Sequence, residues 1–275
     1  MTTSTVARQR FRPSIVGLGV LRGRLEVRQF FRARDSMIFS FALPILLMVV
    51  FGAIFRQRIA PGVTFAQYFV SGMIAAAQLT NGFQTLAVQI PIERDRGVLK
   101  RLAGSPMPAA AYFVGKIMMV YVIGMIGTAL ALAIAVAFYH LHLPTSPARW
   151  LTLGWVTLLG ITACTLCGIA FSSLPRDGKR APAMVVPVAL VLQFTSGVFF
   201  VYTQLPRWMQ HVAALFPLKW TAQGMRSVFL PASFAANEPA GTWELGRVAV
   251  VLSAWVVIGL ALCLLTFRWT AREDR

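Results

Sequence analysis

The sequence contains few charged residues and very few acidic ones. Asp, Glu, Lys and Arg together make up 13% of the 275 residues, whereas hydrophobic residues make up 57%. This charged share is about half of that usual in soluble domains. The mean hydropathy is +0.68. A soluble domain of this length could not bury so much apolar surface, whereas a lipid bilayer acts as the solvent for it. The composition therefore predicts an all-α integral membrane protein.

Several signatures of chemistry are missing from the sequence. It has no phosphate-binding loop of the form G-x-x-x-x-G-K-[ST], no G-x-S-x-G nucleophile elbow and no H-E-x-x-H zinc motif. None of the nine acidic residues lies in the middle of a long apolar segment. We therefore predict a chain without catalytic residues and without a cofactor of its own.

Cysteine and histidine are scarce as well. All three cysteines lie within apolar segments, which predicts no disulfide framework. His140 and His142 are two residues apart at the end of an apolar segment, so on a helix their side chains would diverge. A polar helix end is favoured over a metal site, because no further ligands converge with them.

The net charge of +17 raises the possibility of nucleic-acid binding. A nucleic-acid-binding protein gathers its basic residues on a folded face. Here the basic residues flank long apolar runs, as the positive-inside rule describes. We therefore predict membrane lipids, and no nucleic acid, as the surroundings of these charges.

Six apolar segments are long enough to cross the ~30 Å hydrocarbon core of a bilayer. They run from about Met37 to Phe55, Tyr68 to Ile90, Phe113 to Tyr139, Leu151 to Leu174, Ala181 to Phe200 and Leu245 to Phe267. The second is expected to stop at Pro91. With the N-terminus in the cytoplasm, the cytoplasmic parts hold 19 of the 26 Lys and Arg residues. This bias predicts that both termini are cytoplasmic in a multi-pass protein of the inner membrane.

Two segments outside these spans are also amphipathic. Between Ile15 and Arg34, leucines and arginines recur at helical spacing, which predicts a helix lying in the cytoplasmic interface. Residues 205–231 are apolar but broken by proline, which predicts short re-entrant helices between spans five and six. The predicted organisation is a cytoplasmic segment (1–36), a transmembrane domain (37–267) and a cytoplasmic tail (268–275).

The connection after the second span combines charged and apolar residues. It begins Pro91-Ile92-Glu93-Arg94-Asp95-Arg96-Gly97-Val98-Leu99-Lys100-Arg101-Leu102 and ends in a Pro-x-Pro sequence. We expect a short amphipathic helix over about residues 92–103, ended by the prolines. Its apolar residues Val98, Leu99 and Leu102 would form a docking surface.

This connection resembles the signature of ABC-2 type transporter permeases, in particular the drug-resistance branch found with daunorubicin exporters. The resemblance rests on the run from Glu93 to Leu102, the following Pro-x-Pro, and Gly115-Lys116 at the start of the next span. A second match is Pro217, followed nine residues later by Arg226. The predicted interfacial helix, six spans and cytoplasmic ends are similar to the family too.

The resemblance implies a half-transporter. A second permease subunit would pair with this one, and the pair would dock onto two copies of a separate ATPase chain that binds ATP and Mg²⁺. The predicted coupling helix would be seated in a groove of that ATPase. The residues implicated in coupling are Glu93, Arg94, Gly97, Val98, Leu99 and Leu102.

Polar residues inside the spans suggest a route for a transported compound. Gln78, Asn81, Thr85 and Gln89 share one face of an uninterrupted helix, and Gln193 and Ser196 are paired likewise in the fifth span. The alternative is ordinary hydrogen bonding between helices. Gly160, Cys164 and Gly168 recur every four residues, which predicts close helix packing.

The function that the resemblance implies is export of an amphiphilic drug, lipid or lipid-linked compound, energised by the separate ATPase. The alternatives are a membrane-embedded lipid-modifying enzyme and a secondary carrier. The enzyme would need converging acids, histidines or a metal. The carrier usually has an ionisable residue near the middle of the membrane.

Overall fold

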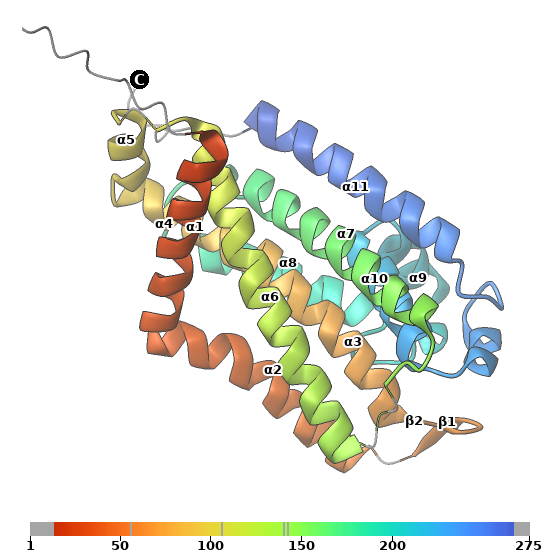
Figure 1. The fold of residues 1–275 in the computed structure, drawn as a ribbon. Helices are drawn as coiled ribbons and strands as arrows, with labels where there is room; N and C mark the ends of the chain where they lie inside the picture. Colours follow the sequence, from red (N-terminus) through yellow and green to blue (C-terminus); the bar gives the residue numbers. More distant parts are fainter. Residues whose placement is uncertain (1–13, 56, 106, 140, 142, 267–275) are drawn as a thin grey trace, which may run out of the picture.

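The computed structural model describes residues 14–55, 57–105, 107–139, 141 and 143–266 (Figure 1). The α-helices are α1 (Ile15–Arg32), α2 (Arg34–Ile54), α3 (Phe65–Leu79), α4 (Thr85–Asp95), α5 (Val98–Ala103), α6 (Ala109–Tyr139), α7 (Pro147–Phe171), α8 (Ala181–Thr195), α9 (Arg207–Ala214), α10 (Pro217–Phe229) and α11 (Leu245–Thr266). A π-helical segment, η1 (Thr80–Gln84), joins α3 to α4, and η2 (Tyr202–Gln204) and η3 (Ala232–Asn237) are short 3-10 helices. The strands β1 (Arg58–Ala60) and β2 (Val63–Thr64) form an antiparallel hairpin.

Three of these helices, α6, α7 and α11, are long and apolar enough to cross a membrane. Two shorter apolar helices are Ser40–Ile54 within α2 and the whole of α8. In addition, α3, η1 and α4 follow one another without a break. The prediction of a helical membrane protein is confirmed. The hairpin β1–β2 is an addition to it, and its sharp turn uses Gly62 at φ +74°.

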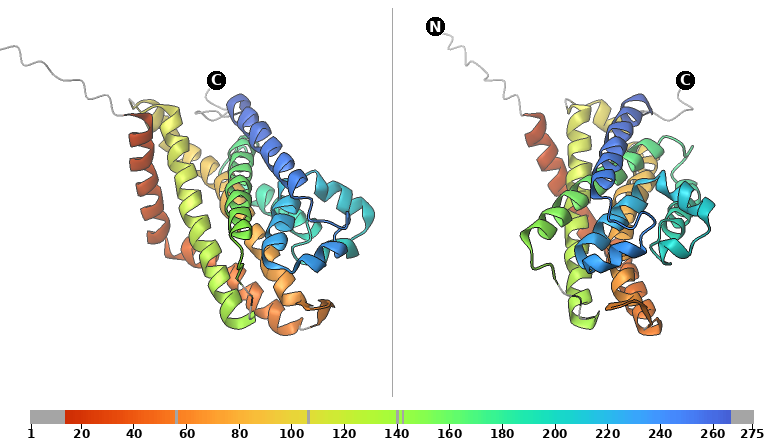
Figure 2. Two further views of the ribbon diagram at one scale, coloured as in Figure 1. Left: turned by 45° about the vertical axis from the view of Figure 1, so that its right-hand side comes forward. Right: turned by 90° about the vertical axis from the view of Figure 1, so that its right-hand side faces the viewer.

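The helices lie side by side between two ends of the molecule (Figure 2). One end, called here the α5 end, carries α5, the start of α1 and the finish of α11. The opposite end, called the hairpin end, carries β1 and β2. Because the first and the last described helices both reach the α5 end, the helical part of the chain starts and finishes on the same side.

The centre of the molecule is packed around α10. Every residue of this helix is buried, and it contacts α3, α7 and α11. Pro217 stands at the first position of α10, where a missing N–H costs nothing. The region predicted as re-entrant is therefore helical, as α9 and α10, with α10 forming part of the protein core.

The π-helical segment η1 packs closely on α7 through small residues. A Cβ atom added to Gly82 would lie 2.9 Å from Cβ of Cys164, and one added to Gly168 would lie 2.7 Å from the Gly82 carbonyl oxygen. A Cβ atom at Gly160 would lie 2.7 Å from Oε1 of Gln78. The predicted small-residue face of α7 is confirmed as a surface for close packing.

The end predicted for the second span is wrong. The helix does not stop at Pro91, because α4 continues through this residue to Asp95. The preceding π-helical turn, in which hydrogen bonds skip one more residue than in an α-helix, also changes the direction of later side chains. A further boundary shift is that α8 ends at Thr195, five residues before the predicted end of the fifth span.

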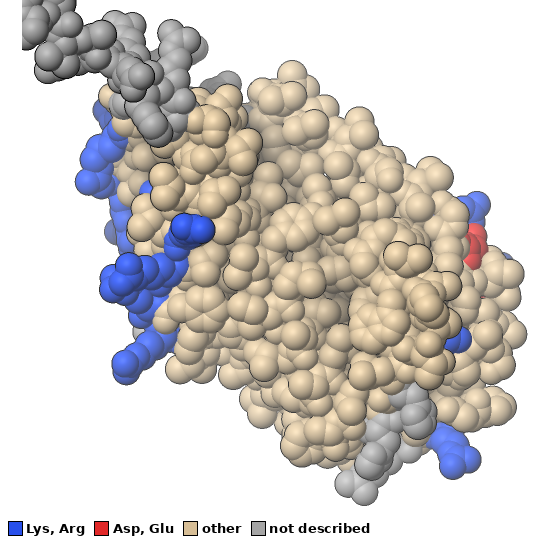
Figure 3. Space-filling view, viewed as in Figure 1, with Lys and Arg blue, Asp and Glu red and all other residues tan. Residues whose placement is uncertain are grey.

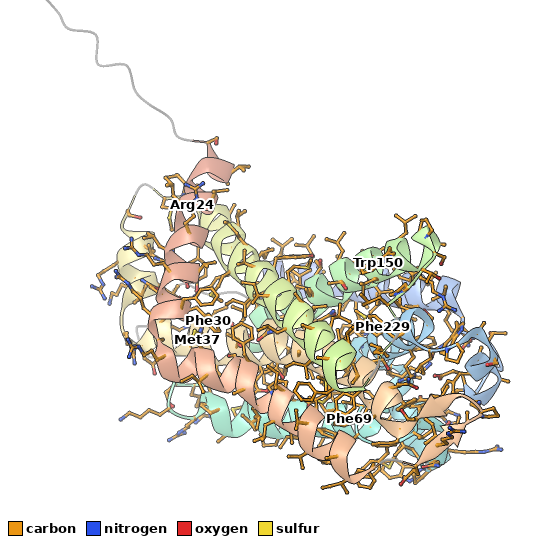
Figure 4. The ribbon with its side chains drawn as sticks, turned by 60° about the horizontal axis from the view of Figure 1, so that its bottom comes forward. Arg24, Phe30, Met37, Phe69, Trp150 and Phe229 are labelled. Carbon is orange, nitrogen blue, oxygen red and sulfur yellow. The ribbon has the colours of Figure 1, made fainter. Side chains whose placement is uncertain are left out.

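The direction of α1 also differs from the prediction. Instead of lying across the ends of the spans, α1 runs alongside the part of α6 nearest the α5 end (Figures 1 and 2). Its buried face consists of Gly19, Gly23, Glu26 and Phe30. Phe30 joins an apolar cluster that includes Met37 of α2 (Figure 4). The amphipathic pattern of leucine and arginine describes the exposed side of α1, and the small residues opposite decide its packing.

Candidate functional site

The predicted coupling segment consists of two helices joined by a tight turn. Glu93 and Arg94 belong to the last turn of α4, and α5 begins at Val98. Gly97 stands between them at φ +69°, a conformation in which residues with a Cβ atom are strained. The prediction of one helix over residues 92–103 is therefore wrong, because the glycine reverses the chain inside that range.

The apolar side of α5 faces the protein. Leu99 is fully buried in a cluster with Leu86, Ile90 and Tyr112, while Val98 and Leu102 are partly buried. The prediction that these three residues form an exposed docking surface is wrong for Leu99. The exposed residues at this corner are polar, namely Asp95, Arg96, Lys100 and Arg101.

Behind this turn lies a group of buried charges, called here the Lys116 network and made of Arg22, Glu26, Glu93, Tyr112 and Lys116. The Lys116 ammonium is fully buried and donates hydrogen bonds to Glu93 and, at 2.9 Å, to Oε2 of Glu26. The other carboxylate oxygen of Glu26 lies 2.6 Å from Nη2 of Arg22. The Tyr112 hydroxyl donates to Oε2 of Glu93 at 2.8 Å.

The Lys116 network is electrically balanced, with two cations and two carboxylates. A buried charge without a partner is costly, so each of these groups depends on the others for its stability. Because Arg22 and Glu26 belong to α1, Glu93 to α4 and Lys116 to α6, the network joins three helices immediately behind α5. It links any displacement of the α4–α5 turn to α1 and α6.

Glycines allow these helices to approach one another. A Cβ atom added to Gly115 would lie 2.7 Å from Cγ of Arg22, and one added to Gly19 would lie 2.5 Å from the Val114 side chain. The Gly115-Lys116 pair of the sequence therefore has two physical roles, one in close packing and one in ion pairing. The contribution of Arg22 and Glu26 was not visible in the sequence, because they lie about 90 residues away from Lys116.

The end of α4 also contacts the loop between α7 and α8. The Arg94 guanidinium donates to the Ser172 carbonyl oxygen at 3.3 Å, and Oδ2 of Asp95 accepts from the backbone N–H of Gly178 at 2.5 Å. A Cβ atom at Gly178 would lie 2.7 Å from Cα of Ile92. The α4–α5 turn and the α7–α8 loop, both predicted to be cytoplasmic, thus form one contiguous surface at the α5 end.

The polar residues of α3 and α4 do not share one face. Gln78 lies against Gly160 of α7, and both polar atoms of its amide are buried without a hydrogen-bond partner. Asn81 lies instead beside Gly127 of α6 and lines a small cavity that includes Pro44 of α2. The prediction of a single polar face is wrong because it assumed an uninterrupted α-helix, whereas η1 lies between these residues.

The remaining candidates for a polar route are separate from these two. The Thr85 hydroxyl donates to the Thr80 carbonyl oxygen at 3.0 Å within its own helix. Gln89 is half-buried, and its Oε1 atom has no hydrogen-bond partner. Gln193 is half-buried in α8, and Ser196 is buried just beyond the end of that helix. Among the described residues, no hydrogen bond joins these four side chains to Gln78 or Asn81.

The second matching motif of the sequence forms a buried ion pair near the hairpin end. Arg226 of α10 is fully buried, and its Nε and Nη2 atoms lie 2.7 and 3.4 Å from the two carboxylate oxygens of Glu238. The guanidinium carbon lies 5.0 Å from the centre of the Tyr68 ring. This buried bidentate ion pair, with the Tyr68 ring beside it, connects η3, α10 and α3. Glu238 and Tyr68 could not be assigned to this site from the sequence, because the fold brings them to it.

A second buried cation, Lys219, lies two residues after Pro217. The Lys219 ammonium donates to Oε1 of Gln223 at 2.5 Å and lies 3.5 Å from the centre of the Trp220 ring. Burial lowers the pKa of Lys219 to about 8, against the raising effect of Glu238. The ammonium is thus held by an amide and by aromatic faces.

These features define a class of protein. The chain has apolar helices long enough to cross a bilayer, and a network of charges lies behind the short helix α5, which is predicted to be cytoplasmic. These are features of a multi-pass membrane protein. The profile of the ABC-2 type transporter family matches residues 23–230, and the chain belongs to this family. The resemblance seen in the sequence is confirmed, and the chain is a membrane permease of an ABC transporter rather than an enzyme.

Curated relatives have the same class of description. The inner membrane transport permease YadH of Escherichia coli K12 is 25% identical over 191 residues, which cover 67% of this chain and 72% of that protein. The putative transport permease ycf38 of Porphyra purpurea is 22% identical over 249 residues, covering 84% and 82%. Its counterpart in Pyropia yezoensis is 21% identical over 246 residues, covering 83% and 81%.

Proposed function

We propose that this chain is the transmembrane subunit of an ATP-driven exporter for an amphiphilic drug, lipid or lipid-linked compound. Membership of the ABC-2 type family supports the transport of a compound across a membrane with an ATPase partner. The direction and the amphiphilic character of the compound are our proposal. The apolar character of α6, α7 and α11 supports it, because such a compound can reach the protein from the bilayer.

The observation that carries the proposal is the placement of the Lys116 network directly behind the α4–α5 turn. A segment that receives force from a partner needs rigid connections to the spans that must move. The ion pair between Glu93 and the buried Lys116 supplies such a connection to α6, and Lys116 extends it to Glu26 of α1. We propose that α5 and the preceding turn are the coupling element.

The proposed membrane topology has six spans. These are α2, the α3–η1–α4 helix, α6, α7, α8 and α11, with the α5 end and both termini in the cytoplasm of a cell whose inner membrane holds the protein. Figure 3 supports this orientation, because basic side chains gather on the side of the molecule that α5 and α1 form, while most of the remaining surface in this view is free of charge.

The surface of the coupling element indicates the chemistry of its partner. Since Leu99 is directed into the permease itself, the exposed surface of the turn that could meet an ATPase includes the basic residues Arg96 and Arg101. We propose that two such permease subunits dock onto two ATPase subunits, each through a groove carrying acidic side chains. ATP and Mg²⁺ would bind to those partner chains.

The polar residues inside the spans can be ranked for contact with the compound. Gln78, Asn81 and Ser196 are buried within one subunit, whereas Gln89 and Gln193 are half-buried. The half-buried amides are better placed to reach a compound between two subunits. Thr85 is the least suited of the set, because its hydroxyl already bonds within the helix.

The test is co-purification of the permease with candidate ATPase chains, followed by measurement of ATP turnover in nanodiscs. The informative variant is Arg101→Glu on α5. Its matched control is Arg207→Glu, which reverses an exposed charge on α9, on the side of the molecule opposite α5 (Figure 1). We expect Arg101→Glu to weaken the complex and Arg207→Glu to leave it intact.

The outcomes separate the competing functions. A complex whose ATP turnover is altered by Arg101→Glu alone supports the exporter and places the coupling element. A permease that purifies without an ATPase and transports under an ion gradient would indicate a secondary carrier. Chemical conversion of a lipid by the purified chain would indicate the enzyme instead.

A further inference from the structure

A cavity of about 310 Å³ lies between α7, α8 and α11. Its floor is a row of small residues at helical spacing on α7, namely Cys164, Cys167 and Ala170. Val188 and Leu192 of α8 form one wall, and Leu262 of α11 belongs to the other. The inner part reaches Leu79 and Phe83, next to the π-helical segment η1. The volume lies within the range of natural ligand sites.

The cavity exists because two helices that cover α7 do not close over it. α11 packs along α7 and α10, and α8 packs on α4, η1 and α9. Within the described residues, α8 and α11 have no extensive contact with each other. Small side chains on α7 then leave a gap between these helices, which larger residues would have filled.

The residues that line the cavity are too apolar to hold water. The lining is almost entirely aliphatic and aromatic, and the Ser173 hydroxyl already donates to the Ala170 carbonyl oxygen. An apolar cavity of this kind stays dry, and an empty one loses the dispersion contacts of its walls. A hydrocarbon chain would restore those contacts.

The cavity opens towards the surface that the bilayer covers. Its rim residues Val188 and Leu262 are partly exposed, and their neighbours Val191 and Leu265 are more exposed still. Both bordering helices are apolar. The medium in contact with the opening is therefore lipid, whose acyl chains have the shape and polarity of the gap.

Charge at one end of the cavity indicates which lipids suit it. The loop that joins the floor helix α7 to the wall helix α8 carries Arg176, Lys179 and Arg180 on its exposed side. Arg180 is paired with Asp177 of the same loop, which leaves an excess of positive charge. A head group at this level of the membrane meets a basic surface, which favours an anionic one.

We propose that the cavity between α7, α8 and α11 is a lipid site that holds one alkyl chain of an anionic amphiphile, with its head group at the loop of residues 175–180. The site does not depend on the direction of transport. None of its lining residues belongs to the Lys116 network.

The experiment is native mass spectrometry of the full-length permease released from nanodiscs of phosphatidylglycerol and phosphatidylethanolamine. The wild type is expected to retain one phospholipid, with phosphatidylglycerol favoured. Val188→Trp, which fills the opening, should lower the retained lipid by about tenfold, the effect of losing two buried methylene groups. The matched control is Val191→Trp on the same helix, which adds the same bulk outside the cavity.

Two further variants protect the result from a folding artefact. Cys167→Phe fills the cavity from its floor, and Leu158→Phe places the same side chain on the exposed face of the same helix. Only the first should lower the retained lipid. Replacing Arg176 and Lys179 by Gln should remove the preference for phosphatidylglycerol while one lipid is still retained.

Several results would overturn the proposal. One is a wild type that retains no lipid, and another is equal loss in the filling variants and their controls. A third is a Val188→Trp variant with a changed oligomeric state and unchanged lipid retention. That result would mean that a second copy of the chain covers the opening.

The bound alkyl chain can belong to a membrane lipid or to the transported compound. Identifying the amphiphile extracted from protein purified directly from cell membranes distinguishes these two sources. A bulk phospholipid would make the cavity a site for membrane lipid. A minor amphiphile enriched over the bulk membrane would make it a site for the transported compound.

Discussion

The burial of Lys116 between two carboxylates allows a quantitative prediction for Lys116→Met. The substitution keeps the length and apolar body of the side chain but removes its charge. Glu26 would keep Arg22 as a partner, whereas Glu93 would keep only the Tyr112 hydroxyl. Removing one partner of a buried ion pair costs about 3–5 kcal/mol, because the remaining charge is left uncompensated. We therefore expect a loss of unfolding free energy of that order.

A second substitution tests the electrostatic origin of this loss. In the double variant Lys116→Met with Glu93→Gln, the charges left in the network are Arg22 and Glu26, which form a pair of their own. The double variant should therefore be more stable than Lys116→Met alone. Interaction energies between residues in contact are typically about 0.5–3 kcal/mol, which sets the expected recovery.

The assay is the unfolding free energy of the purified permease in detergent, followed by intrinsic tryptophan fluorescence. The ATP turnover of the complex with its ATPase provides a second readout, which should fall in Lys116→Met because the ion pair between Lys116 of α6 and Glu93 at the end of α4 is lost. If the losses of the two single variants simply add in the double variant, the two groups do not interact. The reasoning about a balanced buried network would then be wrong.

Other contacts give further predictions. Gly115→Leu should destabilise the protein by about 1–3 kcal/mol, because a side chain there collides with Arg22, whereas Gly154→Leu, in an open position of α7, should change the unfolding midpoint little. Gly97→Ala should cost about 1–2 kcal/mol through left-handed strain, and Gly97→Asn should cost less in the same unfolding assay. For Lys219, whose pKa is lowered to about 8, the unfolded chain binds a proton that the folded chain has lost between pH 8 and about 10.5. Stability should therefore rise with pH across that window, and Lys219→Met should abolish the rise in a pH series of unfolding midpoints.

The sequence alone was sufficient for the class of protein and for its motifs. Apolar length identified a helical membrane protein, and the charged run beginning at Glu93 carried the resemblance to the family, because both signals are local in the chain. The small-residue face of α7 was predicted correctly for the same reason. The sequence could not show that Gly97 divides the run into two helices, since glycine permits a left-handed turn without requiring one.

The partners of buried polar groups lay outside what sequence periodicity can determine. Glu26 reaches Lys116 from a different helix, and Glu238 reaches Arg226 from a separate segment of the chain. Such pairs form only after the fold has excluded water from both members. The π-helical turn at η1 is a similar case, because it separated Gln78 from Asn81 although a regular helix would have aligned them.

The amino-acid sequence by itself therefore determined that this protein is a helical membrane protein and to which family it belongs. These properties follow from the balance of apolar and charged residues along the chain, which acts without reference to distant contacts. Only the tertiary structure decided which side of each helix is buried. It directed Leu99 inwards, placed α1 along α6 through Gly19 and Gly23, and left a cavity between α8 and α11. Each of these results depends on how neighbouring surfaces fit together, and that fit is a property of the folded chain.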